Sequence, residues 1–244
     1  MIIVIAAIAV LVLGTLALFG RPADVTATVF ANPVVAPTAA PAPAIAVAPA
    51  PGVAGQVDED WARAVSNATG IPRLAVIAYA GGSLGSEDNF PGCGLGWNTI
   101  AAIGLVESDH GRHDGSAIGP TGAVAPPIYG VALDGDGVAL IADSDSGVLD
   151  GDVTHDRAMG PMQIIPDTWR SWLIDGNGDG IGDPQNIFDA ALSAGNYLCH
   201  ASGGMSTSDG WLSGIAAYNA GEDYLRKVAE AAQRYADAAA SVPR

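Results

Sequence analysis

The chain has 244 residues, and 49% of them are hydrophobic, which is enough for one sizeable domain or for one domain with an appendage. Ten basic residues face 26 acidic residues, a net charge of −16. A surface of that charge repels phosphate backbones, so we expect no nucleic-acid binding. Two cysteines exclude a disulfide-dense mini-protein and a four-thiolate zinc site. The sequence also contains no P-loop, no HExxH helix and no GxSxG turn, which are three common enzyme signatures.

Residues 1–31 form an apolar N-terminal segment. Residues 2–19 carry no charge, and a helix of that length spans a bilayer. Two interpretations remain open, a signal peptide cleaved after Val29-Phe30-Ala31 and an uncleaved membrane anchor flanked by Arg21. Both place the rest of the chain outside the cytoplasm, in the cell envelope, with membrane contact only through this N-terminal helix.

Residues 32–56 are rich in alanine, proline and valine. Proline at this density disfavours helix and favours extended, semi-rigid chain. The stretch has no charged and no aromatic residue. We therefore expect a linker that adds nothing to a core and holds a domain away from a membrane.

Residues 57–244 predict a folded, mainly α domain. Apolar periodicity, capping residues and proline positions predict helices over residues 58–68, 72–80, 97–109, 166–173, 187–199, 209–218 and 221–240. Residues 115–157 are rich in glycine and aspartate and predict long loops with a short hairpin. Strands and helices do not alternate, so we expect a helical domain with an irregular Gly/Asp-rich central insert.

Glu107 is one of only five glutamates, and it follows the apolar run of residues 100–106. A carboxyl group at the end of a buried helix is partly desolvated, which raises its pKa. A carboxylic acid that stays protonated near neutral pH is what a general acid needs. The spacing alone also allows a glutamate at a helix end that turns to solvent.

Two further segments carry candidate binding residues. The Gly-Pro pair at residues 160–161 permits a tight turn that presents Met162 and Gln163 toward a cleft, although an ordinary loop before a helix has the same pattern. Tyr218 and Asn219 lie at a predicted helix end. There they can hydrogen-bond sugar hydroxyls, or they can form a C-cap.

Together these segments resemble the motifs of the lytic murein transglycosylases, most closely the membrane-bound lytic transglycosylase B-like branch with a lysozyme-like SLT domain. The motifs are Glu107-Ser108-Asp109-His110-Gly111, Gly160-Pro161-Met162-Gln163 and Tyr218-Asn219. Their order and spacing agree with the family across about residues 57–235, most of the predicted domain.

The resemblance implies a role for each motif. Glu107 would be the catalytic acid and base. Substrate-binding residues would be Ser108, Met162, Gln163, Tyr218 and Asn219. The substrate would be the glycan strands of peptidoglycan, cleaved between N-acetylmuramic acid and N-acetylglucosamine with formation of 1,6-anhydro ends. This chemistry needs no cofactor, and we expect a monomer.

Two alternatives to this function remain. A glycosidase with two carboxylates needs a second acid at a set distance. Asp109, Asp114 or Asp156 could supply it, which would make the protein a hydrolytic muramidase of the same fold. A non-catalytic cell-wall-binding module is the other alternative, and the acidic composition argues mildly against it.

Residues 175–183 resemble the first half of an EF-hand loop, and related lytic transglycosylases carry such a loop at this point. Oxygen ligands at positions 1, 3, 5 and 7 with a glycine at position 6 suit calcium. The candidate ligands are Asp175, Asn177, Asp179, Ile181 and Asp183. Because the closing acid comes too early, a bound structural Ca²⁺ and an unoccupied Asp/Gly turn both remain open. A second acidic segment, residues 143–152, is interpreted as a solvated loop with Asx turns.

The two cysteines, Cys93 and Cys199, are expected to form a disulfide, because lone cysteine pairs outside the cytoplasm usually do. Such a bridge would brace the helix that carries Glu107, and two buried free thiols are the alternative. His110 and His113 form a bare HxxH pair, which is poor evidence for zinc.

Overall fold

The computed structural model describes residues 33–45 and 51–243. The expected N-terminal apolar helix, within residues 1–31, lies outside the described residues. None of the helices in the two described stretches is long and apolar enough to cross a membrane.

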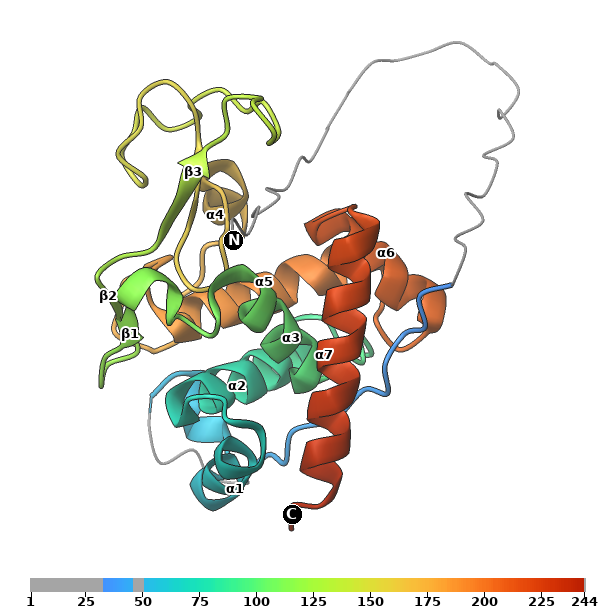
Figure 1. The fold of residues 1–244 in the computed structure, drawn as a ribbon. Coiled ribbons are helices and arrows are strands. Elements are labelled where there is room, and N and C mark those ends of the chain that lie inside the picture. Colours follow the sequence, from blue (N-terminus) through green and yellow to red (C-terminus); the bar gives the residue numbers. More distant parts are fainter. Residues whose placement is uncertain (1–32, 46–50, 244) are drawn as a thin grey trace.

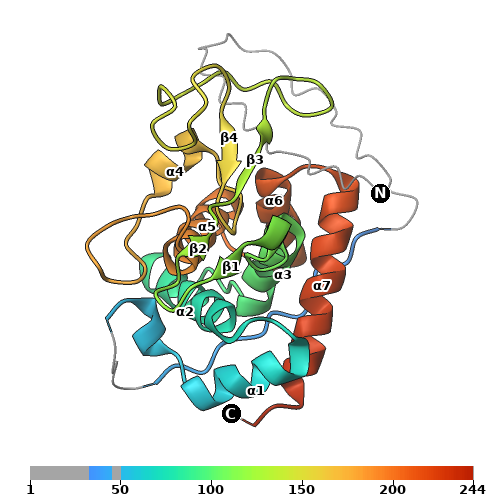
Figure 2. The ribbon, with the colours of Figure 1, turned by 60° about the vertical axis from the view of Figure 1, so that its left-hand side comes forward.

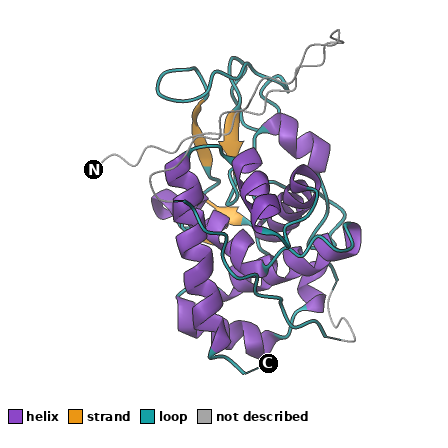
Figure 3. Cartoon of the chain, turned by 90° about the vertical axis from the view of Figure 1, so that its right-hand side faces the viewer, coloured by secondary structure: helices purple, strands orange, loops and turns teal. Residues whose placement is uncertain are grey.

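Helices make up about half of the described chain and the strands are few and short, so the predicted mainly helical class is confirmed (Figure 3). The α-helices are α1 (Glu59–Thr69), α2 (Arg73–Asn89), α3 (Trp97–Ser108), α4 (Pro166–Trp172), α5 (Ile187–Ser202), α6 (Ser208–Tyr218) and α7 (Glu222–Ala240). Short 3₁₀ helices are Val53–Gln56 and His113–Gly115. The strands are β1 (Ala117–Ile118), β2 (Val124–Ala125), β3 (Tyr129–Ala132) and β4 (Arg157–Met159).

The elements separate into a helical body and a smaller lobe. Strands β3 and β4 lie together with α4 at one end of the molecule, and the loops of the central insert extend beyond them (Figure 1, Figure 2). Helix α7 runs along one side of the helical body and ends near α1 (Figure 2). Ser108, the last residue of α3, donates a hydrogen bond to the carbonyl oxygen of Pro161, just after β4, so the end of α3 contacts the smaller lobe.

Helix α2 forms part of the centre of the helical body. Its residues 75–83 are buried on every side, as expected of a helix without a polar face. It approaches α5 so closely that a Cβ on Gly82 would lie only 3.0 Å from the carbonyl oxygen of Ala191. The helix runs past its predicted end at residue 80 to Asn89. Its glycines pack against neighbours and do not end it.

The predicted disulfide between Cys93 and Cys199 is confirmed, with Cα atoms 5.6 Å apart across a sequence separation of 106. It joins the loop before α3 to the end of α5. A bridge across a loop of this length stabilises the fold by about 4 to 5 kcal/mol in the chain-entropy model. Because Cys93 lies four residues before α3 begins, the bridge anchors the start of the helix that carries Glu107.

The central insert is more ordered than predicted. Strands β1 and β2 form one antiparallel pair, with Ile118 opposite Val124. Strands β3 and β4 form a second, with Tyr129 opposite Met159. The first pair is the predicted short hairpin, and residues 133–156 form the predicted long loops. The pairing of β3 with β4, which joins the two ends of the insert, was not predicted. A small second core forms around the fully buried Leu133. This core stabilises the insert, although its many glycines and aspartates are typical of loops.

One buried amide side chain, that of Asn98 at the start of α3, makes two of the hydrogen bonds that hold residues 33–45 on the helical body. Its Oδ1 accepts a hydrogen bond from the Ala40 N–H at 2.9 Å. Its Nδ2 donates to the carbonyl oxygens of Thr38 and Ala232, each at 3.0 Å. Asn98 thus joins α3, α7 and the N-terminal segment, which passes α7 in Figure 1.

Apolar side chains of the predicted linker also pack on the core. Val53 is buried in the main core, and Val34 and Ala42 pack against it. The expectation that residues 32–56 add nothing to a core is therefore wrong for the described part of that stretch. The composition of this segment does not reveal its packing, because the side chain that binds its backbone, Asn98, lies elsewhere in the sequence.

We expect Asn98→Ala to lower the free energy of unfolding by about 2 to 4 kcal/mol, because it leaves the Ala40 N–H and the Thr38 carbonyl oxygen without these partners and removes a bond to α7. Urea unfolding at neutral pH measures the change. Asn67→Ala, which alters an exposed asparagine of α1, is the matched control and should change stability by less than about 0.5 kcal/mol. Equal losses in both variants would contradict the role given to Asn98.

Candidate active site

Glu107 lies in the last turn of α3, a helix that is buried on almost every side. Its side chain is 5% exposed, and its Oε1 accepts a hydrogen bond from the Tyr224 hydroxyl at 2.6 Å. Burial raises the pKa of Glu107 to about 8, and the hydrogen bond from Tyr224 acts in the opposite direction. Glu107 does not turn to solvent. It is a carboxylic acid at neutral pH, the form that can donate a proton.

The chain leaves α3 through a turn that Ser108 holds in place. Asp109, His110 and Gly111 have positive φ angles of 51°, 60° and 78°, which are uncommon for residues other than glycine. Ser108 Oγ accepts a hydrogen bond from the Gly111 N–H at 2.8 Å and donates one to the carbonyl oxygen of Pro161 at 2.7 Å. The first predicted motif is thereby tied to the second. Both bonds are internal, so the structure places Ser108 as a support of the turn.

The second motif presents a hydrogen-bond acceptor without a partner. Gln163 has a φ of 49° and is 2% exposed. Its Nε2 donates to the carbonyl oxygen of Gly160 at 2.9 Å, whereas its Oε1 is buried with no hydrogen-bond partner. Gly130 of β3 makes room for this oxygen, because a Cβ there would lie 3.0 Å from it. A buried acceptor left unpaired is costly, so this oxygen stands out among the buried polar atoms of the motif.

The third motif contacts the turn that carries Met162 and Gln163. The hydroxyl of Tyr218, the last residue of α6, donates to the carbonyl oxygen of Met162 at 2.7 Å, and both side chains are buried. Asn219 Oδ1 accepts a hydrogen bond from the Gly221 N–H at 2.9 Å. This bond shapes the short connection to α7. The structure thus brings the three predicted motifs into one continuous set of contacts.

Tyr224 is the residue of this site that sequence reasoning missed. It lies in the first turn of α7, 117 residues after Glu107. The available signal was weak, because the chain has six tyrosines and the period of α7 shows only that this one lies on the buried face. No local pattern indicates which tyrosine reaches a distant carboxyl group.

The aspartates considered as a second carboxylate have other contacts. Asp109 forms an exposed ion pair with Arg112 at 2.8 Å. Asp156 is buried, and its two oxygens accept hydrogen bonds from the N–H and the Oγ of Ser144, each at 2.8 Å. Asp114 is exposed in a 3₁₀ helix. These contacts do not favour a second carboxylate at the site.

The loop predicted to bind calcium is organised by its own backbone. Asp175 Oδ1 accepts hydrogen bonds from the N–H groups of Gly178 and Asp179, and its Oδ2 accepts one from Gly180 at 2.7 Å. At the base of the loop the buried carboxylate of Asp189 accepts three further backbone hydrogen bonds. These bonds fold the loop without an ion, and they leave calcium binding there a prediction.

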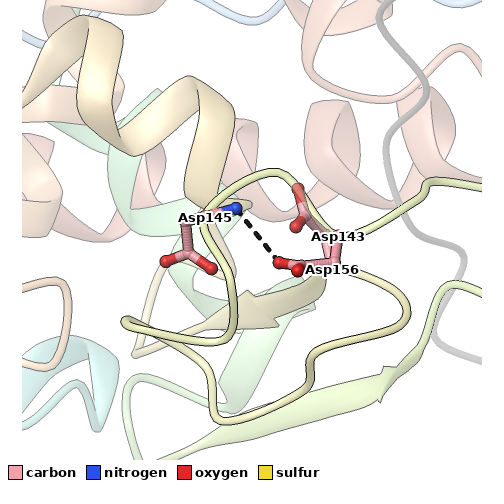
Figure 4. Close-up of side chains that lie close together, drawn as sticks. All are labelled: Asp143, Asp145 and Asp156. Carbon is pink, nitrogen blue, oxygen red and sulfur yellow. Dashed lines mark hydrogen bonds between the residues drawn. The ribbon is translucent and has the colours of Figure 1, made fainter.

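A different acidic group lies in the central insert. Asp143, Asp145 and Asp156 each offer a carboxylate oxygen, and these oxygens lie within 4.8 Å of one another (Figure 4). The Asp143 carboxylate also accepts hydrogen bonds from the N–H groups of Asp145 and Gly147. Bonds of this kind are those of the Asx turns predicted for residues 143–152, and they account for the grouping.

One comparison with known proteins gives a match to a family model. The family described as transglycosylase SLT domain matches residues 129–240, from the first residue of β3 to the last residue of α7. The matched range includes the second and third motifs and Tyr224, whereas Glu107 lies before it. The match is to the SLT domain in general and leaves the B-like branch a prediction. No curated protein and no solved structure matches the chain.

The burial of Glu107 predicts how stability depends on pH. Its pKa is about 8 in the folded protein against an ordinary 4.5, so the folded state binds the proton more tightly. We therefore expect the wild type to be most stable relative to Glu107→Gln near pH 4.5, and to lose a few kcal/mol of that relative stability by about pH 8. Urea unfolding of both proteins at pH 5, 7 and 9 measures this. A difference independent of pH would mean that Glu107 is solvated.

Proposed function

We propose that this chain, a peptidoglycan lytic transglycosylase with a lysozyme-like SLT domain over residues 129–240, uses Glu107 as its single catalytic carboxyl group. The observation that carries the proposal is the burial of Glu107, which raises its pKa to about 8 and so keeps the carboxyl protonated at neutral pH. The Tyr224 hydroxyl donates a hydrogen bond to the same carboxyl group. The bond cleaved is that from N-acetylmuramic acid to N-acetylglucosamine. The chemistry requires no cofactor.

In the first step Glu107 acts as a general acid. Its proton moves to the glycosidic oxygen, the bond from C1 of the muramic sugar to that oxygen breaks, and an oxocarbenium-like centre forms at C1. Glu107 becomes a carboxylate, which the hydrogen bond from the Tyr224 hydroxyl stabilises. A low-polarity setting strengthens this bond, because water does not compete for the same oxygen.

In the second step the same carboxylate acts as a base. It takes the proton of the 6-hydroxyl of the muramic sugar as the oxygen of that hydroxyl attacks C1. A 1,6-anhydro ring closes, Glu107 is again protonated, and no water is consumed. One carboxyl group is sufficient for this cycle, and the described aspartates considered as partners have other contacts.

The remaining predicted residues hold the sugar in place in this proposal. The unpaired Oε1 of Gln163 accepts a hydrogen bond from a hydroxyl or amide N–H group of the substrate. Tyr218 and Asn219 position the sugar that bears the scissile bond, and Met162 supplies apolar contact. The assignment to the B-like branch, the action outside the cytoplasm and the N-terminal signal or anchor belong to the same proposal, because peptidoglycan lies outside the cytoplasmic membrane.

A structural calcium ion at residues 175–183 is a further part of the proposal. Three oxygen-bearing side chains lie at the spacing that calcium requires, Asp175, Asn177 and Asp179. The ion would stabilise the loop, and it would take no part in the reaction. Thermal unfolding with calcium and with a chelator measures its presence independently of activity.

The function is tested by mass spectrometry of purified peptidoglycan digested with the protein. We expect muropeptides lighter by one water than products with a reducing end, and we expect them to be absent with Glu107→Gln, which keeps the size of the side chain but cannot donate the proton. Products with reducing ends would instead identify a hydrolase. Binding to the wall without any fragments would identify a non-catalytic module.

Tyr224→Phe should change the pH dependence of the reaction. Activity needs protonated Glu107, so kcat/KM falls as the pH rises through about 8. Because the hydrogen bond from Tyr224 lowers the pKa of Glu107, its loss moves this fall to higher pH. We also expect kcat to drop about tenfold, since the carboxylate intermediate loses its partner.

The matched control for this prediction is Tyr129→Phe, which removes a hydroxyl that donates to Leu149 in the central insert. The control should keep the pH profile of the parent. If Tyr224→Phe also kept that profile, the hydrogen bond to Glu107 would have no part in setting its acidity.

A further inference from the structure

His110 is a buried titratable side chain that the reaction above does not use. It is 1% exposed. Its Nδ1 lies 3.1 Å from the hydroxyl of Tyr79 on α2, and its Nε2 lies 2.9 Å from the hydroxyl of Tyr235 on α7. A neutral imidazole has one donor and one acceptor nitrogen, and a tyrosine hydroxyl can serve in either role. Both ring nitrogens are therefore satisfied inside the protein, which leaves neither available for the zinc considered from the sequence.

The backbone around His110 is held in an unusual conformation. Its N–H donates to the carbonyl oxygen of Gly104 at 2.9 Å, and with Asp109 and Gly111 it forms a run of three positive φ angles. Residues other than glycine keep such a conformation only where their surroundings enforce it. The two tyrosine contacts supply that constraint, because they bind the His110 ring to helices on either side.

Tyr79 contacts α3 as well as His110. A Cβ on Gly104 would lie 2.1 Å from the Tyr79 hydroxyl oxygen, so the absence of a side chain at that position lets the phenol reach the ring of His110. Gly104 precedes Glu107 by slightly less than one turn of the helix. The contacts of Tyr79 therefore lie directly beside the catalytic end of α3.

Helix α7 contacts the end of α3 through two tyrosines. Tyr224 donates to Glu107, and Tyr235, eleven residues later, bonds to His110. These tyrosines lie about 16 Å apart along the helix axis. One contact alone would leave α7 free to tilt about it, whereas two fix its direction relative to α3. Removing the second contact should therefore displace the first.

We propose that His110 is a positioning residue for the transglycosylase reaction, which holds the end of α3 against α2 and α7 so that the Tyr224 hydroxyl meets the Glu107 carboxyl. The proposal rests on the function assigned to Glu107. His110 acts through Tyr224, and it touches neither the substrate nor the reacting atoms.

The charge of His110 agrees with this role. Burial is the main cause that lowers the pKa of His110 to about 4, with a smaller contribution in the same direction from Arg112 and an opposing one from Asp109. A positive charge three residues from Glu107 would favour its ionised form and deplete the acid. A neutral ring holds the turn without that cost.

A double-mutant cycle between His110 and Tyr224 tests the proposal. Each of His110→Phe and Tyr224→Phe should lower kcat on peptidoglycan strands about tenfold, with KM within about twofold of the parent. Because both changes disrupt the same hydrogen bond to Glu107, we expect the double variant to be about as slow as either single variant. A purely structural His110 would lower the melting temperature and leave the effects on kcat multiplicative.

Three further variants test whether the effect on kcat comes from the hydrogen bonds of His110. Tyr235→Phe keeps the aromatic ring and removes only the hydroxyl, so it provides the same cycle with Tyr224→Phe if His110→Phe does not fold. His110→Gln restores an amide donor and acceptor and should recover part of kcat. His113→Gln alters an exposed histidine three residues further on and should match the parent.

The outcomes separate this proposal from the function of Glu107. If Glu107→Gln is inactive and the effects at His110 and Tyr224 multiply, Glu107 keeps its role and the positioning by His110 is overturned. If Glu107→Gln is as active as the parent, the role of Glu107 fails and that of His110 fails with it. Coupled effects together with an inactive Glu107→Gln are the result that we expect.

Discussion

The structure depends on one costly arrangement, a carboxyl group removed from water at the end of a buried helix. Desolvation alone would favour a Glu107 that never ionises, and such a group could donate a proton but could not accept one back. The hydroxyl of Tyr224 opposes this effect. It leaves a pKa of about 8, as the proposed reaction requires of a side chain that gives up a proton and recovers it within one cycle.

That arrangement is useful only if the end of α3 cannot move. Both ends of the helix are anchored by side chains that bind distant backbone or distant helices. At the start, Asn98 joins residues 33–45 to α7, and the Cys93–Cys199 disulfide fixes the preceding loop. At the other end, Ser108 binds the turn at Pro161, and His110 binds two tyrosines. The same helix α7 takes part at both ends.

The sequence was most informative where function follows from a residue and its near neighbours. The apolar run before Glu107 was consistent with either a buried or a solvent-facing carboxyl group, the family resemblance singled this residue out, and two lone cysteines predicted their disulfide. It was least informative where a contact joins residues far apart in the chain. Tyr224 meets Glu107 across 117 residues, and no period or cap encodes such a pairing. The composition of residues 33–45 likewise gave no sign that Asn98 binds their backbone.

The pairing of β3 with β4 at the ends of the central insert was not predicted, for a related reason. Its glycines and aspartates are typical of loops, and most of its aspartates do form turns by accepting hydrogen bonds from backbone N–H groups. Yet Gly130, which looks like a flexible loop residue, lies in β3 where any larger side chain would press on the Gln163 amide. This glycine thus shapes the turn at residues 160–163, because it leaves the space that the unpaired Gln163 oxygen occupies.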